Sequence, residues 1–114
     1  MPRYVILEHD HPLLHWDLML ESGDVLRTWR LLEQPEAGKT VAAEALGEHR
    51  RLYLDYEGPV SGGRGTVKRW DAGDFTAVSD QTDGVEVHLN GRRLKGTAAL
   101  VRCDQEQWSF QLSE

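Results

Sequence analysis

A chain of 114 residues, 39% apolar and 28% charged, with four tryptophans to pack, is typical of one soluble globular domain, 1–114. Its net charge of −6 argues against a general nucleic-acid coat, because nonspecific DNA affinity depends on many lysine and arginine contacts to phosphates. No apolar run reaches the ~20 residues of a membrane helix and no signal-peptide pattern opens the chain, so we expect a cytoplasmic monomer.

Short segments separated by glycine-containing turns follow one another along the whole chain. This spacing, close to one turn for about every ten residues, is typical of short antiparallel strands and predicts an all-β barrel or sandwich with little helix. The expected strands are 3–8, 15–21, 25–31, 41–46, 66–71, 75–79, 85–89, 98–102 and 108–112.

Two segments carry more specific predictions. Asn90-Gly91 is expected to be a tight hairpin turn, because both residues tolerate positive φ. Residues 35–48, which include an alanine-rich stretch, favour a helix and a strand about equally. Cys103 is the only cysteine, so no internal disulfide or CxxC zinc site can form, and we expect its thiol to be a small buried hydrophobe.

Basic residues cluster weakly, and the usual interpretation of such groups is a solvated face. The clusters are Arg27/Arg30, Arg50/Arg51, Arg64/Lys68/Arg69 and Arg92/Arg93/Lys95.

The segment 8–21 carries most of the candidate chemistry. His9 ends one expected strand, and a short turn around Pro12 brings it within reach of His15 and Asp17 on the next. Two imidazoles and one carboxylate on one side of a metal leave open positions for water or substrate. The alternative is that these are surface polar residues on a half-exposed hairpin. The period of two places His15, Asp17, Met19 and Glu21 on one face, and Trp16, Leu18 and Leu20 on the other.

A second candidate site is formed by His49 and Tyr53, four residues apart. They would offer a proton donor and a phenol hydroxyl to a phosphoryl oxygen, provided that the chain bends so that both point inward. The alternative for Tyr53, and for Tyr56 beside it, is aromatic packing against the barrel.

Several separated motifs occur along the chain in a characteristic order. They are Tyr4-Val5-Ile6-Leu7-Glu8-His9-Asp10, His15-Trp16-Asp17, Val25-Leu26-Arg27-Thr28-Trp29, His49 to Tyr53, Asp55-Tyr56-Glu57-Gly58, Gly65-Thr66-Val67-Lys68-Arg69-Trp70-Asp71, Leu94-Lys95-Gly96, Ala99-Leu100-Val101-Arg102 and Trp108. Together they resemble the 3′-phosphoesterase domain family of bacterial DNA ligase D, over nearly the whole chain.

The resemblance implies a small antiparallel β-barrel that uses Mn²⁺ or another divalent transition metal. Family members remove a terminal ribonucleoside and then the 3′-phosphate from nucleic-acid 3′ ends in DNA repair. It puts His9, His15 and Asp17 at metal-binding positions, and His49 and Tyr53 at catalytic, phosphate-contacting positions. Thr28 falls where the family has a serine that lines the site. Nucleic-acid 3′ ends, with a DNA ligase or polymerase, are the expected partners.

The chain departs from the family pattern at Met19, which stands where the family has an arginine that holds the substrate phosphate. A thioether can neither neutralise a phosphate nor donate to it. Arg30, which shares a strand face with Thr28, either compensates or is solvent-exposed. Glu33 stands where the family usually has a lysine, and we expect the chain to lack the N-terminal extension of ligase D. The alternative function is therefore a noncatalytic, metal-containing module that binds 3′ ends or docks a partner.

A third hypothesis belongs to another class. His15-x-Asp17 with a distant His88 imitates the two-histidine, one-carboxylate triad of non-haem iron oxygenases. Whole-chain resemblance and the short length of the chain argue against it.

Overall fold

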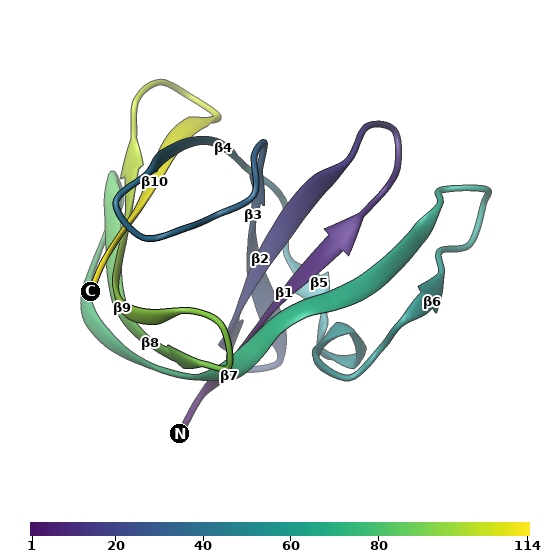
Figure 1. The fold of residues 1–114 in the computed structure, drawn as a ribbon, viewed down its shortest axis with the longest axis horizontal. Coiled ribbons are helices and arrows are strands. Elements are labelled where there is room, and N and C mark those ends of the chain that lie inside the picture. Colours follow the sequence, from purple (N-terminus) through teal and green to yellow (C-terminus); the bar gives the residue numbers. More distant parts are fainter.

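The computed structural model describes residues 1–114 as a set of antiparallel strands joined by short turns (Figure 1). The only helical segment is a 3-10 turn, η1, at Arg51–Leu54. The strands are β1 Arg3–His9, β2 His15–Ser22, β3 Val25–Leu31, β4 Thr40–Ala45, β5 His49–Arg50, β6 Gly58–Pro59, β7 Thr66–Gln81, β8 Gly84–Gly91, β9 Lys95–Arg102 and β10 Gln107–Ser113. The structure contains no helix with the length and hydrophobicity that spanning a membrane requires.

Eight strands close into a barrel, which confirms the predicted small antiparallel β-barrel. They follow the order β1-β2-β3-β4-β10-β9-β8-β7, and β7 then pairs with β1. Closure leaves no open edge among these strands, so their backbone groups find partners within the sheet. The two short strands lie outside this ring, where β5 pairs with β3 and β6 pairs with β7.

Strand β7 replaces the two strands predicted at 66–71 and 75–79. It continues through Gly73, because that glycine allows close approach to β8: a Cβ there would overlap the carbonyl oxygen of Asn90. Its register against β1 shifts between Ile6 and Leu7, and such a bulge bends a strand so that it can wrap around a barrel. The glycine therefore marks a close contact rather than a turn.

The first strands are buried on both faces, and the two faces differ. Trp16, Leu18 and Leu20 of β2 point into the barrel interior, as the period of two predicts, and join its core cluster. Met19 points outward into a second, smaller cluster, formed by Val5, Leu7, Met19, Leu26, Leu54 and Val67. The outer face of β1, β2 and β3 is therefore covered rather than solvated.

The cover is the segment 46–65, which contains β5, η1 and β6 and lies outside the barrel wall (Figure 1). Leu54 anchors it by packing into the outer cluster. Arg3 of β1 donates to Asp55 at 2.7 Å, and this hydrogen bond holds the pKa of the Asp55 carboxyl below its ordinary value. Arg51 pairs with Glu21 of β2. These contacts hold the segment 46–65 against the outer wall of the barrel. A cavity remains between the segment and the wall.

The predicted turn at Asn90-Gly91 is wrong. Neither residue has positive φ, and the turn lies further along, where the Gly91 N–H donates to the Leu94 carbonyl at 2.9 Å. Gly91 is needed for another reason: a Cβ there would overlap the Tyr4 hydroxyl and the Asp71 carboxylate. Asp71 holds the turn by accepting N–H groups of Arg92, Arg93 and Leu94.

Two other expectations are corrected. The helical alternative for 35–48 is wrong, because Val41 and Ala43 point into the core as part of β4, which pairs with β3 and β10. Closing the barrel outweighs the helix propensity of the alanines. Cys103 is exposed rather than buried, because it lies in the turn between β9 and β10.

Candidate metal centre

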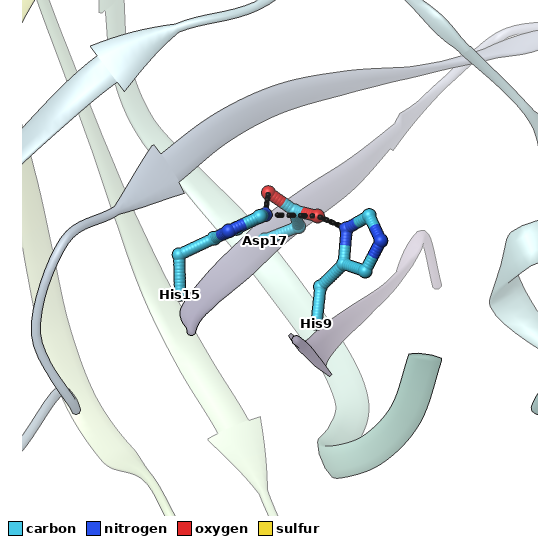
Figure 2. Close-up of side chains that lie close together, drawn as sticks. All are labelled: His9, His15 and Asp17. Atoms are coloured by element: carbon cyan, nitrogen blue, oxygen red, sulfur yellow. Dashed lines mark hydrogen bonds and ion pairs between the residues drawn. The ribbon is translucent and has the colours of Figure 1, made fainter. Parts of the chain in front are cut away.

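Three side chains gather at the end of the β1–β2 hairpin on the outer face of the barrel. His9 and His15 are register partners, and Asp17 follows two residues later on the same face of β2. His15 Nε2 lies 3.2 Å from both carboxylate oxygens of Asp17, and His9 Nδ1 lies 3.4 Å from Oδ2 (Figure 2). One ligand atom from each residue fits within a distance of 4.8 Å, as a single metal ion requires.

Backbone carbonyls fix which nitrogen of each ring carries the proton. His15 Nδ1 lies 2.8 Å from the Leu13 oxygen, and His9 Nε2 lies 2.8 Å from the Arg64 oxygen. Since a carbonyl only accepts, each of these nitrogens donates. In the neutral rings the remaining nitrogens then turn lone pairs toward the Asp17 carboxylate. Lone pairs that face a carboxylate are stabilised by a positive charge between the groups, and a divalent ion would supply one.

The carboxylate itself is short of partners. Asp17 is 4% exposed, and its Oδ1, although close to His15 Nε2, makes no hydrogen bond. A buried carboxylate oxygen without a donor is costly, by about 1–3 kcal/mol or more, unless a cation balances it. The donor set of two imidazoles and one carboxylate suits a divalent transition metal. The buried oxygen and the facing lone pairs thus fit a metal ion at this position.

The cluster opens onto a cavity of about 330 Å³ between the barrel wall and the covering segment. His9 and Asp17 line it, while His15 lies behind them. The other polar residues of the wall are His11, Arg30, His49, Tyr53 and Arg64. A ligand in this cavity would therefore touch the candidate metal position and several hydrogen-bond donors at once.

His49 and Tyr53 both line the cavity, because η1 turns the chain between them. Their rings meet edge to face with centroids 6.1 Å apart, and Tyr53 packs in the same way against Tyr56. His49 Nδ1 lies 2.9 Å from the Gly47 carbonyl, to which it donates, so Nε2 remains available. The two residues thus combine aromatic packing with free polar atoms.

Two residues of strand β3 lie near the cluster, and only one of them lines the cavity. Arg30 is the register partner of Asp17 and lines the cavity; its Nη1 lies 3.7 Å from Glu44, and its buried Nε has no partner. Thr28 is buried beside Met19, its register partner; it does not line the cavity, and its hydroxyl donates to the Leu26 carbonyl at 3.1 Å. Met19 itself is 2% exposed and forms part of the apolar wall.

Two lining residues were not recognised from the sequence. His11 belongs to the β1–β2 turn, and Arg64 is one of the clustered basic residues for which the sequence predicts a solvated face. The signal that marks Arg64 is its place in Gly62-Gly63-Arg64-Gly65, where every glycine has positive φ. His88, in contrast, is exposed on β8 and takes no part in the cluster, so the triad that included it is wrong.

The chain matches the model of the DNA Ligase D 3'-phosphoesterase domain over residues 7–102. It is 32% identical over 121 residues to the multifunctional non-homologous end joining protein LigD of Pseudomonas aeruginosa, an alignment that covers 93% of the chain and 14% of the relative. It is 30% identical over 114 residues to the multifunctional non-homologous end joining DNA repair protein LigD of Mycobacterium tuberculosis, with 92% of the chain and 15% of the relative covered. The chain spans only a small part of the length of these relatives. By its fold, its motifs and this match, it belongs to the DNA ligase D 3′-phosphoesterase domain family.

Proposed function

We propose that the chain is a metal-dependent 3′-phosphoesterase that acts on nucleic-acid 3′ ends in DNA repair, removing a 3′-phosphate or a 3′-ribonucleoside. The observation that supports it best is the convergence of two imidazole lone pairs and a buried carboxylate at the wall of a polar cavity. Membership of the phosphoesterase domain family supports the reaction class.

In this proposal His9, His15 and Asp17 hold one Mn²⁺ or a similar divalent transition metal. Bound there, such an ion would neutralise a phosphate oxygen and lower the pKa of a bound water. The chain contributes the orientation: the Leu13 and Arg64 carbonyls fix both rings, and a hydrogen bond from the far ring nitrogen also increases the basicity of a histidine ligand.

The phosphate-contacting roles go to His49, Tyr53 and Arg30. The Tyr53 hydroxyl and His49 Nε2 have no partners in the chain; the hydroxyl would donate to a phosphate oxygen, and Nε2, whose ring already donates through Nδ1, would donate only with a second proton on the ring. Arg30 adds a permanent positive charge beside Asp17. Thr28 is assigned to supporting the wall, since its hydroxyl already donates to a backbone carbonyl.

A second candidate function is a noncatalytic, metal-containing module that binds 3′ ends or docks a partner. It is favoured by Met19, whose buried thioether contributes neither a charge nor a hydrogen-bond donor to the cavity wall. The named relatives are multifunctional end-joining proteins of which the chain matches one part, so under either function a DNA ligase or polymerase is the proposed protein partner. A cytoplasmic location is proposed with it.

The deciding experiment offers primer ends that carry a 3′-phosphate or a single 3′-ribonucleotide to the folded protein with Mn²⁺. We expect release of phosphate or nucleoside that disappears with a chelator and in Asp17→Asn, but persists in the matched control His88→Ala. Mn²⁺ binding without release from either end would favour the docking module. Absence of both metal binding and release would reject both functions.

A further inference from the structure

We propose that Arg64 is the residue that binds the terminal phosphate in this cavity, a specificity role for which the ligand class is a phosphomonoester dianion. The inference rests on the proposed function for the identity of the substrate, and on the contacts of the 61–65 loop for the site. Met19, which lies on β2 beside the candidate metal centre, offers the cavity only a thioether. A dianion needs charge from elsewhere, and Arg64 reaches the cavity from the opposite, loop side.

The loop that carries Arg64 is held in place rather than free. Gly62, Gly63 and Gly65 have φ values of 77°, 69° and 77°, which L side chains rarely adopt. The Val60 N–H donates to the Gly65 carbonyl at 2.8 Å, which closes the loop. A Cβ on Gly65 would overlap Asp10, so this glycine lets the loop pack directly against the β1–β2 turn.

A side-chain contact from that turn fixes the same end of the loop. The Thr66 N–H donates to Asp10 Oδ1 at 2.8 Å. Asp10 directly follows His9, so the position of the loop and the position of one metal ligand are set together.

The guanidinium of Arg64 is oriented but not neutralised. Its Nε donates to the Ser61 carbonyl at 2.8 Å and its Nη2 approaches Ser61 Oγ at 3.4 Å. It forms no ion pair with any carboxylate, whereas Arg30, the other arginine of the cavity, has Glu44 at 3.7 Å. Of the five guanidinium N–H donors, those not directed at Ser61 remain for a ligand. An oriented, uncompensated guanidinium is suited to bidentate binding of phosphate.

The backbone of Arg64 also contacts the candidate metal centre through a hydrogen bond. Its carbonyl oxygen accepts the His9 Nε2 hydrogen at 2.8 Å. One residue thus holds a candidate metal ligand with its main chain, lines the cavity, and carries a charge that no carboxylate neutralises. Side-chain substitutions leave the carbonyl in place, so they separate the two contributions.

The test is a calorimetric titration of the Mn²⁺-loaded protein with inorganic phosphate. Loss of one charge-assisted contact in Arg64→Ala should weaken phosphate binding about tenfold to a hundredfold. Arg64→Gln, which keeps a polar end group but no charge, should lose as much, while Arg64→Lys should lose less because it keeps the charge. Arg92→Ala removes a surface arginine outside this cavity and should bind phosphate as the wild type does. Mn²⁺ affinity should stay the same in all of them.

Equal phosphate affinity in the wild type, Arg64→Ala and Arg64→Gln would overturn the inference, and so would a wild type that binds no phosphate. A parallel loss of Mn²⁺ affinity in both variants would also overturn it, because the effect would then be structural. The readout is binding rather than turnover. A protein that binds phosphate through Arg64 but never releases it from a 3′ end would reject the proposed function and leave this inference standing.

Discussion

His9 Nε2 donates to the backbone carbonyl of Arg64 at 2.8 Å, across 55 residues of sequence. This bond turns the other ring nitrogen toward Asp17, which lies 3.4 Å away. A contact between a strand end and a glycine-rich loop therefore decides which atom of His9 faces the candidate metal position. A hydrogen bond of this kind, from the ring nitrogen that does not face the metal, fixes the tautomer of a ligand histidine.

Removing either buried side chain of the candidate metal centre should abolish tight metal binding. His15→Ala and Asp17→Ala should each lower Mn²⁺ affinity by more than about a hundredfold, since even the loss of a hydrogen bond to a ligand side chain costs about ten- to a hundredfold. Calorimetric titration measures this, with His88→Ala as a control histidine that is exposed on β8. Unchanged binding in both variants would remove the metal site from the account.

Phosphate that binds in the cavity should change the NMR signals of two aromatic residues. When phosphate is added to protein loaded with a diamagnetic divalent ion, the side-chain NMR signals of His49 and Tyr53 should shift, because both line the cavity. Tyr4, buried in the barrel core, serves as the internal control. A response at Tyr4 without one at His49 or Tyr53 would mean that the anion binds elsewhere.

Stability should fall in alkaline solution because of Tyr4. Burial, together with the 2.6 Å hydrogen bond to Asp71, raises the pKa of Tyr4 far above the ordinary tyrosine value of about 10. Above that pH the unfolded chain loses a proton that the folded chain keeps, so the free energy of unfolding declines as the pH rises. Below about pH 10 this contribution is fully present.

Tyr4→Phe provides the comparison for that pH dependence. Losing a hydrogen bond to a carboxylate should cost about 1.5–3 kcal/mol at neutral pH. The variant should then lose less stability than the wild type between about pH 10 and 11, as measured by urea unfolding. Parallel decline in both proteins would assign the alkaline effect to other groups.

Met19→Arg should rescue an Arg64→Ala variant. The arginine stem would replace the Met19 side chain in the outer cluster, and its guanidinium would extend into the cavity that Met19 lines. We expect a lower Tm, because a charge enters a site that is 2% exposed, together with recovery of phosphate affinity by about tenfold or more.

In the wild-type background, Met19→Arg should increase the release of phosphate from 3′ ends. Met19→Leu, which adds no charge, should leave phosphate affinity unchanged, and a folded double variant with no recovery would show that position 19 cannot reach the phosphate.

Local patterns were enough to predict the hairpin that carries the cluster. The period of two on β2 puts Asp17 and His15 on one face, and the short turn returns the chain so that His9 and His15 become register partners. These relationships involve residues within ten positions of one another, where strand geometry alone decides.

Contacts between distant residues decided what the sequence could not predict. Arg64 lines the cavity from a loop whose end is held by the hydrogen bond from Thr66 to Asp10, and no local sequence pattern predicts that pairing. Gly91 was misread as a turn residue because its real constraint is the space occupied by Tyr4 and Asp71. A glycine required for close approach and a glycine required for positive φ look alike in a sequence.

The central claim is that metal held by His9, His15 and Asp17 enables release of phosphate from nucleic-acid 3′ ends. Its most direct test measures the rate of phosphate release from a 3′-phosphorylated primer while Mn²⁺ is titrated into metal-free protein. The account predicts no release without metal, a rate that saturates together with calorimetric occupancy of one site, and no release by Asp17→Asn at any Mn²⁺ concentration. Release that persists in Asp17→Asn, or that does not depend on Mn²⁺ in the wild type, would contradict it.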